Sequence, residues 1–176
     1  MVFDIDDIPD GGLDFEVAVE KDRFNINQRD CYLARNVEIQ GGLTRRKREI
    51  FFKGRVKTRL LLECSRCLSA LEFGIDANVY SRYVPKPKNE EFFGDHELNG
   101  QETETEYYLD NRIDLKNSVH DAILLDVPMF LLCREDCKGF CGKCGKSLND
   151  EICECGKGGH SDPRFDILRQ LKDKLK

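Results

Sequence analysis

Closely spaced pairs of cysteines constrain this chain more than any other feature of its sequence. Eight of its nine cysteines fall into four pairs, with two, three, two and one residues between the partners. Thiolates this close in sequence can bend onto a single metal ion, and a tetrahedral site needs four ligands. The spacing therefore predicts enough ligands for two four-thiolate metal sites. The predicted ligands are Cys64, Cys67, Cys133, Cys137, Cys141, Cys144, Cys153 and Cys155.

The four pairs can be partitioned in two ways. In the arrangement that we favour, the last two pairs hold one ion, because the eight residues between them (145–152) suffice for a tight hairpin. Glycine after a second thiolate, as in CGKCG, lets the backbone fold closely around the metal. The first two pairs then hold a second ion and join segments far apart in the sequence. In the alternative, one site is drawn from residues 133–155, and Cys64 and Cys67 remain free.

The ligand type predicts zinc in one or two structural sites. Four thiolates form a soft tetrahedral set that suits zinc, although iron, bound as in rubredoxin or as an iron–sulfur cluster, uses the same ligands. Catalytic zinc keeps an open position for water, usually beside histidine or carboxylate ligands, whereas an all-thiolate site is closed. The ninth cysteine, Cys31, stands alone on a strand-like segment and is expected in the core.

Thiol chemistry is the alternative to metal binding. The segment Cys64-Ser65-Arg66-Cys67 has the spacing of a redox motif, and its arginine can lower a thiol pKa. No βαβ pattern surrounds it, as a thioredoxin-like site requires. The three histidines, His96, His120 and His160, do not form a recognisable triad or an H-E-x-x-H motif. The sequence therefore predicts a protein that is not an enzyme.

Patterns of charge and hydropathy predict a cytoplasmic protein with no membrane partner. The first residues do not resemble a signal peptide, and no run approaches the roughly 20 apolar residues of a membrane span. In a reducing compartment, paired cysteines are more often metal ligands or catalytic thiols than disulfides. The 33 acidic and 28 basic side chains give a formal net charge of -5, which excludes a globally basic nucleic-acid binder. Binding to nucleic acid therefore needs basic side chains that gather on one part of the surface.

Alternating apolar and polar residues predict an α+β fold that is rich in antiparallel strands. Residues 13–20 and 32–40 alternate as half-exposed strands do. From residue 48 a longer alternating run passes through CSRCLSA into a second run, which predicts a long hairpin with a cysteine pair at its tip. One further strand is expected over 106–113, and a helix over 114–127, capped by Asp114 and ended by Pro128. We expect a small barrel-like sheet crossed by this helix.

Two domains are predicted. Residues 1–128 form the β-rich domain, within which residues 85–106 are an acidic, flexible insertion. Residues 129–176 form a cysteine-rich zinc-binding module with a C-terminal helix, which begins at Asp162 and Pro163 and packs on its own domain. The apolar stripe of this helix is Phe165, Leu168, Leu171 and Leu175.

Basic residues gather between positions 45 and 59. Eight bases stand there against one acid, Glu49, with Phe51 and Phe52 among them. A strand that directs such bases outward can follow a phosphate backbone. A solvated strand face whose charges prevent edge pairing explains the pattern equally well. The candidate RNA-binding residues are Arg45, Arg46, Lys47, Arg48, Lys53, Arg55, Lys57 and Arg59.

The order of these motifs resembles the YceD family of large-ribosomal-RNA accumulation proteins. The resemblance rests on CSRCL, DLKNSVHDAILLDVPMFLLCREDCKGFCGKCGKSLN, CEC and DPRFDILRQL, which lie between residues 60 and 171. It implies a non-enzymatic factor that large-subunit ribosomal RNA needs in order to accumulate, acting in early ribosome assembly or RNA stabilisation. It also implies metal binding by the last four cysteines. Gly142 departs from the family pattern, because many relatives carry proline there.

We therefore expect an RNA-associated assembly factor whose metal sites hold a basic sheet in shape. Its expected partner is the ribosomal RNA of the large subunit. The alternative is a zinc-dependent adaptor that docks on a ribosomal protein or an RNA-processing nuclease and does not contact RNA.

Overall fold

The computed structural model describes residues 1–24, 26, 31–87, 105–150 and 153–157. The chain divides into two compact units. The first comprises Met1–Glu63 and Ala70–Leu131, and the second comprises Cys64–Ser69 and Leu132–Lys176. The second unit thus includes residues 64–69, a segment that lies within the predicted domain 1–128. The predicted C-terminal helix lies outside the described residues, as do residues 88–104 of the predicted insertion 85–106. At the ends of that predicted insertion, Pro85, Thr105 and Glu106 belong to strands.

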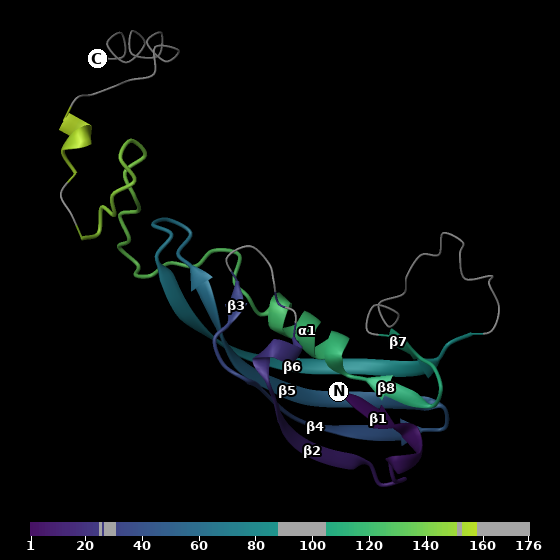
Figure 1. The fold of residues 1–176 in the computed structure, drawn as a ribbon. Coiled ribbons are helices and arrows are strands. Elements are labelled where there is room, and N and C mark those ends of the chain that lie inside the picture. Colours follow the sequence, from purple (N-terminus) through teal and green to yellow (C-terminus); the bar gives the residue numbers. More distant parts are fainter. Residues whose placement is uncertain (25, 27–30, 88–104, 151–152, 158–176) are drawn as a thin grey trace, which may run out of the picture. The chain divides into compact units, whose positions relative to one another are not determined.

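The described part of the first unit contains eight strands and one α-helix (Figure 1). In chain order these elements are β1 (Val2–Asp4), β2 (Leu13–Val19), β3 (Tyr32–Leu33), β4 (Val37–Arg46), β5 (Glu49–Glu63), β6 (Ala70–Pro85), β7 (Thr105–Tyr108), β8 (Arg112–Asp114) and α1 (Lys116–Leu125). Short 3-10 turns occupy Ile5–Asp7, Lys21–Arg23 and, in the second unit, Glu154–Lys157. None of the described helices is long and apolar enough to cross a membrane.

The main sheet has the strand order β2-β4-β5-β6-β7, and β3 pairs with β5 beyond the end of β4. All of these pairings are antiparallel except that of β6 with β7. Strands β1 and β8 form a separate two-stranded sheet. Among the described strands, no pairing joins β2 to β7, so the barrel-like closure expected from the sequence is not seen there. The mostly β architecture with one helix agrees with the predicted α+β class.

The long hairpin predicted from the sequence is formed by β5 and β6. Its register runs from Ile50 opposite Tyr83 to Glu63 opposite Ala70, so the Cys64 and Cys67 pair lies in the connecting turn, as predicted. Side chains alternate between the two faces along β5, with Val56 buried and its neighbours Arg55 and Lys57 exposed. One face of the sheet is therefore apolar, and the other presents charged side chains to solvent.

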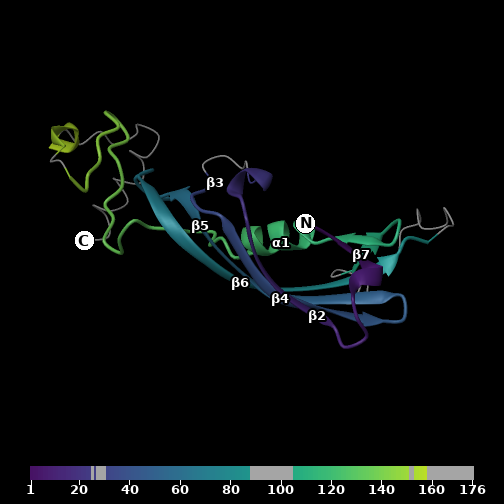
Figure 2. The same ribbon diagram turned by 60° about the horizontal axis from the view of Figure 1, so that its bottom comes forward.

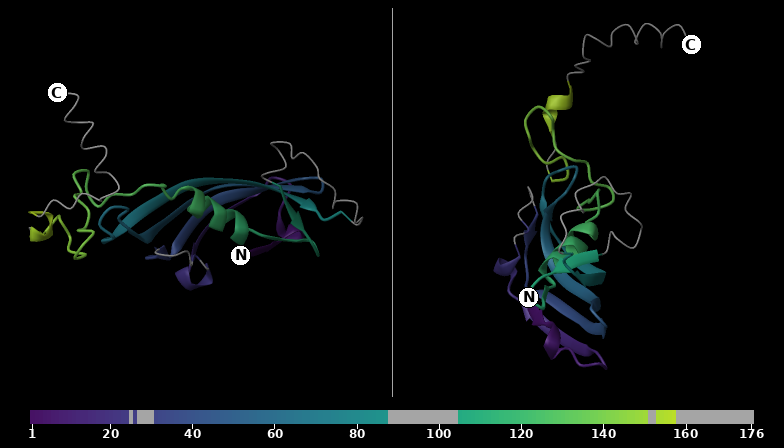
Figure 3. Two further views of the ribbon diagram at one scale, coloured as in Figure 1. Left: turned by 90° about the horizontal axis from the view of Figure 1, so that it is seen from above. Right: turned by 90° about the vertical axis from the view of Figure 1, so that its right-hand side faces the viewer.

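The core lies between the apolar face of the sheet and α1. Figures 2 and 3 show a bent sheet with α1, β1 and β8 on the same side of it. Val119 and Ile123 of α1 are fully buried, as are Val56 and Leu60 of β5. Because burying each such side chain stabilises the fold by about 2 kcal/mol, this layer holds the helix over β5 and β6. Cys31 is buried in the same core, as expected.

Two local predictions need correction. The segment 106–113 is not one strand, because Asp110 and Asn111 take left-handed backbone angles (φ 51° and 58°) and turn the chain between β7 and β8. The helix-capping residue is Leu115 and not Asp114. The Asp114 carboxylate nevertheless supports the helix start, since it accepts the backbone N–H of Lys116 at 3.0 Å.

Candidate metal centres

The eight paired cysteines gather into two groups of four thiols. Within each group, all four sulfur atoms lie within 4.8 Å of one another. The hairpin cluster consists of Cys64, Cys67, Cys133 and Cys137. The C-terminal cluster consists of Cys141, Cys144, Cys153 and Cys155. These two groups are the ones that we favoured from the sequence. They do not match the alternative, in which Cys64 and Cys67 remain free.

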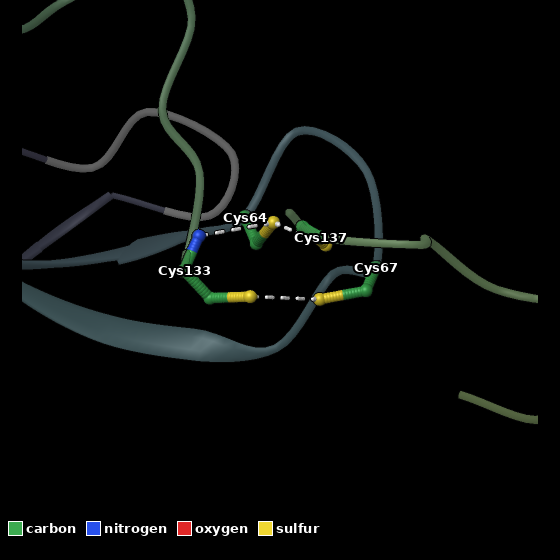
Figure 4. Close-up of side chains that lie close together, drawn as sticks. All are labelled: Cys64, Cys67, Cys133 and Cys137. Atoms are coloured by element: carbon green, nitrogen blue, oxygen red, sulfur yellow. Dashed lines mark hydrogen bonds between the residues drawn. The ribbon is translucent and has the colours of Figure 1, made fainter. Parts of the chain in front are cut away.

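The four sulfur atoms of the hairpin cluster lie close enough together to bind one ion (Figure 4). The Sγ atoms of Cys64 and Cys137 lie 3.7 Å apart, and those of Cys67 and Cys133 lie 3.6 Å apart. Four sulfurs at about 2.3 Å from a zinc ion have edges of about 3.8 Å, whereas a disulfide bond measures about 2 Å. These separations therefore suit a shared metal ion and exclude disulfide bonds between these pairs.

The hairpin cluster begins in a tight Cys-x-x-Cys turn. The backbone N–H of Cys64 donates to the carbonyl of Ser69 at 2.9 Å, and the N–H of Leu68 donates to the carbonyl of Cys64 at 2.9 Å. Leu68 has a left-handed φ of 58°, which is unfavourable for a residue with a side chain. The turn thereby brings Cys67 back towards Cys64, at the cost of strain at Leu68.

The C-terminal cluster repeats this turn with the same hydrogen bonds. The N–H of Cys141 donates to the carbonyl of Lys146, and the N–H of Gly145 donates to the carbonyl of Cys141, both at 2.8 Å. Gly145 has a φ of 71°, so the glycine after the second thiolate supplies the backbone freedom that the sequence predicts. The Sγ atoms of Cys144 and Cys153 lie 3.5 Å apart. Two turns from distant parts of the sequence thus have the same geometry.

The electrostatics of the hairpin cluster favour a cation. Burial opposes ionisation of Cys64, but the N–H groups of Arg66, Cys67 and Cys133 point at its sulfur and lower its pKa to about 6. Burial and the neighbouring thiols raise the pKa of Cys133 to about 12. One thiolate therefore forms easily and further ones are opposed, so that four thiolates require a positive ion among them.

In the C-terminal cluster, too, one thiol has a lowered pKa and another has a raised pKa. The N–H groups of Cys144 and Lys143 lower the pKa of Cys141 to about 6. The N–H of Cys155 favours ionisation of Cys153, but the thiols of Cys141 and Cys144 outweigh it and raise the pKa of Cys153 to about 12. This cluster, too, accommodates four thiolates only with a positive ion among them.

Asn149 links the two clusters, and no sequence motif identifies it. It belongs to the loop between Cys144 and Cys153 of the C-terminal cluster. Its side-chain N–H donates to Sγ of Cys137 in the hairpin cluster at 3.4 Å, and its side-chain oxygen accepts the N–H of Lys138 at 2.8 Å. A donor that holds a ligand sulfur in this way fixes the ligand and stabilises its thiolate.

Apart from Arg45, the candidate RNA-binding bases lie on the solvent face of the β4 and β5 pair or in the turn that joins these strands. Arg45 and Arg46 end β4, and Lys47 and Arg48 form the turn that follows. The other four occupy alternate exposed positions of β5. They are Lys53, Arg55, Lys57 and Arg59.

Acids of β6 neutralise two of these bases. Arg55 makes a two-pronged ion pair with Asp76, with 2.7 Å between Nη2 and Oδ2, and Nη1 of Arg59 lies 3.2 Å from Glu72. The hydrogen bond from Arg55 lowers the pKa of Asp76. The excess of bases counted along residues 45–59 therefore overstates the positive charge of this part of the face.

The positive charge is less compensated at the β4–β5 turn. Arg46, Lys47 and Arg48 are exposed there, and in the described residues no salt bridge joins them or Lys53 to an acid. Glu49, the one acid in this stretch of sequence, pairs instead with Arg82 of β6. Arg45 is half-buried and bonds to the carbonyl groups of Ile5 and Lys47.

Within the described residues, no histidine joins the two cysteine clusters. His120 lies on α1, and its Nδ1 is 3.1 Å from the carboxylate of Asp121. His96 and His160 lie outside the described residues.

Comparison with known proteins identifies the family. A family model described as "Large ribosomal RNA subunit accumulation protein YceD" matches residues 52–172. The chain belongs to the YceD family. The match confirms the resemblance noted in the sequence, and it includes α1 and all eight paired cysteines. Residues 45–48, which hold half of the candidate RNA-binding bases, precede the matched span.

Several proteins are similar to the chain at 23–27% sequence identity. The Arabidopsis thaliana protein "Large ribosomal RNA subunit accumulation protein YCED homolog 1, chloroplastic" is 24% identical over 159 residues, which are 79% of this chain and 49% of the plant protein. An uncharacterized Mycobacterium leprae protein is 27% identical over 118 residues (67% of this chain, 49% of that protein). The uncharacterized Bacillus subtilis protein YlbN is 23% identical over 171 residues (97% of this chain, 94% of that protein). The chain therefore spans about half the length of the plant and mycobacterial relatives. No solved structure matches it.

Proposed function

We propose that this protein is a non-enzymatic factor that supports the accumulation of large-subunit ribosomal RNA. The observation that carries the proposal is its membership of the YceD family, whose description names this process. The plant homologue carries the same name. A cytoplasmic location remains a prediction from the sequence, to be checked by cell fractionation.

Depletion in the native host tests this function. Loss of the protein is expected to lower the amount of large-subunit ribosomal RNA relative to small-subunit ribosomal RNA, and expression of the wild-type chain is expected to restore the ratio. An unchanged ratio after complete depletion contradicts the proposal.

In this proposal each cysteine cluster holds one structural zinc ion. The closed set of four thiols, the sulfur separations of 3.5–3.7 Å and the two matching Cys-x-x-Cys turns support the assignment. The ions organise the second unit, which includes few regular elements among its described residues. Small metal modules of this kind depend on the ion for much of their folding free energy.

We further propose that ribosomal RNA contacts the basic residues at the β4–β5 turn. Lys47, Arg48 and Lys53 offer charge that the fold does not neutralise with a salt bridge in its described part. Arg55 and Arg59 already bind carboxylates, so a phosphate must first displace Asp76 or Glu72. Contacts to the phosphate backbone do not depend on the nucleotide sequence, and they weaken as the salt concentration rises.

RNA binding at two salt concentrations tests this contact. Lys47→Gln with Arg48→Gln removes two charges at the turn, and Arg55→Gln with Arg59→Gln is the charge-matched control. The turn variant is expected to bind more weakly than the control, with a salt dependence smaller by about 1 to 2 in logarithmic slope. Equal binding by both variants and the wild type contradicts the contact.

An adaptor that binds a ribosomal protein or a nuclease is the second candidate. The ion pairs of Arg55 and Arg59 favour it, because they reduce the charge available to RNA. It predicts that depletion lowers the ribosomal RNA ratio although the purified protein binds no RNA at low salt. Direct RNA binding that the turn variant abolishes contradicts the adaptor.

A further inference from the structure

Strand β6 has an open edge in the described part of the first unit. Strand β5 pairs with β6 on one side along nearly its whole length. On the other side β7 pairs only with Arg82–Pro85, and no described strand continues this pairing over residues 70–81. Open strand edges present backbone groups that can pair with another chain.

The backbone groups of this edge point away from β5. The N–H of Asp76 donates to the carboxylate of Asp126 at 3.2 Å, so Asp76 directs its backbone groups to the open side. Alternate residues of a strand direct their backbone groups to the same side, and Asn78 and Tyr80 therefore face this edge as well. The bond to Asp126 shows that an acceptor can reach an edge amide from the direction of α1.

A groove of about 710 Å³ lies beside this edge, between β6 and α1. Among the described residues, its lining contains four acids, Asp76, Glu106, Asp121 and Asp126, and no base. Asp76 is neutralised by Arg55, so the uncompensated negative charge comes from β7 and from α1 and its C-cap. Burial, together with Asp121 and Asp114, raises the pKa of Glu106, as expected in a negative environment. Apolar surface is present too, because Leu125 is 86% exposed.

We propose that the open edge of β6 binds an extended, lysine- or arginine-rich segment of a partner protein, which adds to the sheet as a strand. Its backbone pairs with Asn78 and Tyr80, and its basic side chains meet the acids of the groove. Addition of a strand to a sheet edge is a common mode of peptide recognition, in which backbone bonds give affinity and side chains give specificity. The proposal uses other residues than the RNA contact proposed above, which involves Lys47, Arg48 and Lys53.

The charge of the groove selects this occupant over two others. Nucleic acid is repelled by the acids of α1 and β7. The chain's own residues 88–104 are a poor occupant, since their sequence contains six acids and one lysine. A basic polypeptide complements the charge and supplies backbone amides.

Synthetic peptides test the charge requirement on the full, metal-loaded chain. A short peptide of alternating lysine and valine is expected to bind in fluorescence anisotropy and to bind more weakly at high salt, whereas a glutamate and valine peptide is not. Asp121→Lys reverses one exposed charge of the groove, and the dissociation constant is expected to rise about tenfold. Asp10→Lys makes the same change of net charge outside the groove and is expected to leave binding unchanged. Absence of binding, or equal binding of both peptides or both variants, overturns the proposal.

N-methylated peptides test strand pairing without altering the protein. Methyl groups on alternate amides along one edge of the lysine peptide are expected to abolish binding, and methyl groups along the other edge are expected to leave it intact. If both methylated peptides bind like the parent, the partner does not pair as a strand. Sedimentation of the free chain shows whether a second copy occupies the edge, and a dimer that persists with the lysine peptide in excess contradicts the proposed occupant.

Discussion

The side-chain amide of Asn149 donates to the sulfur of Cys137 at 3.4 Å, so the loop of the C-terminal cluster contacts a thiol of the hairpin cluster. This contact predicts selective loosening of one metal site. In Asn149→Ala, the hairpin cluster is expected to release its ion to a chelator about tenfold faster, because ligand-supporting contacts typically contribute tenfold or more to metal affinity. Release from the C-terminal cluster is expected to change less.

Asn149→Asp separates the two bonds of this side chain. It keeps the oxygen that accepts the N–H of Lys138 but loses the N–H that reaches Cys137. It is therefore expected to release the hairpin ion at least as fast as Asn149→Ala does, because its carboxylate also repels the Cys137 thiolate. Wild-type release from Asn149→Asp would show that the bond to Cys137 does not support the site.

Gly145 is expected to be essential for the geometry of the C-terminal cluster. Alanine at this position must adopt a φ of 71°, which costs about 1 kcal/mol. Gly145→Ala should therefore weaken metal binding by about fivefold, measured by competition with a chromophoric chelator. Gly142→Ala is the matched control, because Gly142 has open space around its Cα and no left-handed φ. Equal affinity of the two variants contradicts the role of the turn.

Leu68 is expected to be a site where glycine stabilises the protein. Its φ of 58° is strained, and its side chain is 56% exposed, so that removing the side chain relieves strain and loses little burial. Leu68→Gly is expected to bind the hairpin ion more tightly and to raise the melting temperature of the metal-loaded chain. The control Leu61→Gly changes a residue of β5 that pairs with Glu72 of β6, and it is expected to lower the melting temperature. A lower melting temperature for Leu68→Gly would contradict the strain argument.

The stability of the first unit is expected to depend on the ionisation of Glu106. Burial raises its pKa above the ordinary value of 4.5, with Asp121 and Asp114 adding to the effect and a hydrogen bond from Ser118 opposing it. A raised carboxyl pKa means that the folded state binds the proton more tightly than the unfolded state. The charged form therefore destabilises the fold above the raised pKa, and this penalty disappears as the pH falls to about 4.5.

Glu106→Gln removes this penalty. The variant is expected to have a higher free energy of unfolding than the wild type at neutral pH, and the difference is expected to shrink as the pH falls towards 4.5. Urea unfolding at a series of pH values measures it. The exposed control Glu16→Gln lacks the burial and should show little difference at any pH. A constant difference between Glu106→Gln and the wild type contradicts the assignment.

Short-range patterns predicted much of the fold, and the spacing within each cysteine pair predicted the candidate ligands. The alternation along β5 and β6 and the position of Cys64 and Cys67 at the hairpin tip depend on residues close in sequence. The split of residues 106–113 into β7 and β8 was missed, although Asp110 and Asn111 are residue types that tolerate a left-handed turn. Turn residues inside an apparently continuous strand are the signal that could have predicted it.

Contacts between distant segments could not be predicted in the same way. Asp76 and Glu72 neutralise Arg55 and Arg59 because the register of β6 against β5 brings them together. Counting charges along residues 45–59 gives no information on that register. The contact of Asn149 with Cys137 joins the loops of two different cysteine clusters, and no spacing rule identifies a residue that supports a ligand.

Metal stoichiometry by elemental analysis tests the central structural claim most directly. Protein purified without chelators is expected to contain two zinc ions per chain, and Cys67→Ser and Cys144→Ser are each expected to reduce this to one. Two iron atoms would keep the two-site grouping and change the ion. One ion per wild-type chain, lost in Cys144→Ser and retained in Cys67→Ser, would contradict the hairpin cluster, and a chain free of metal would contradict both clusters.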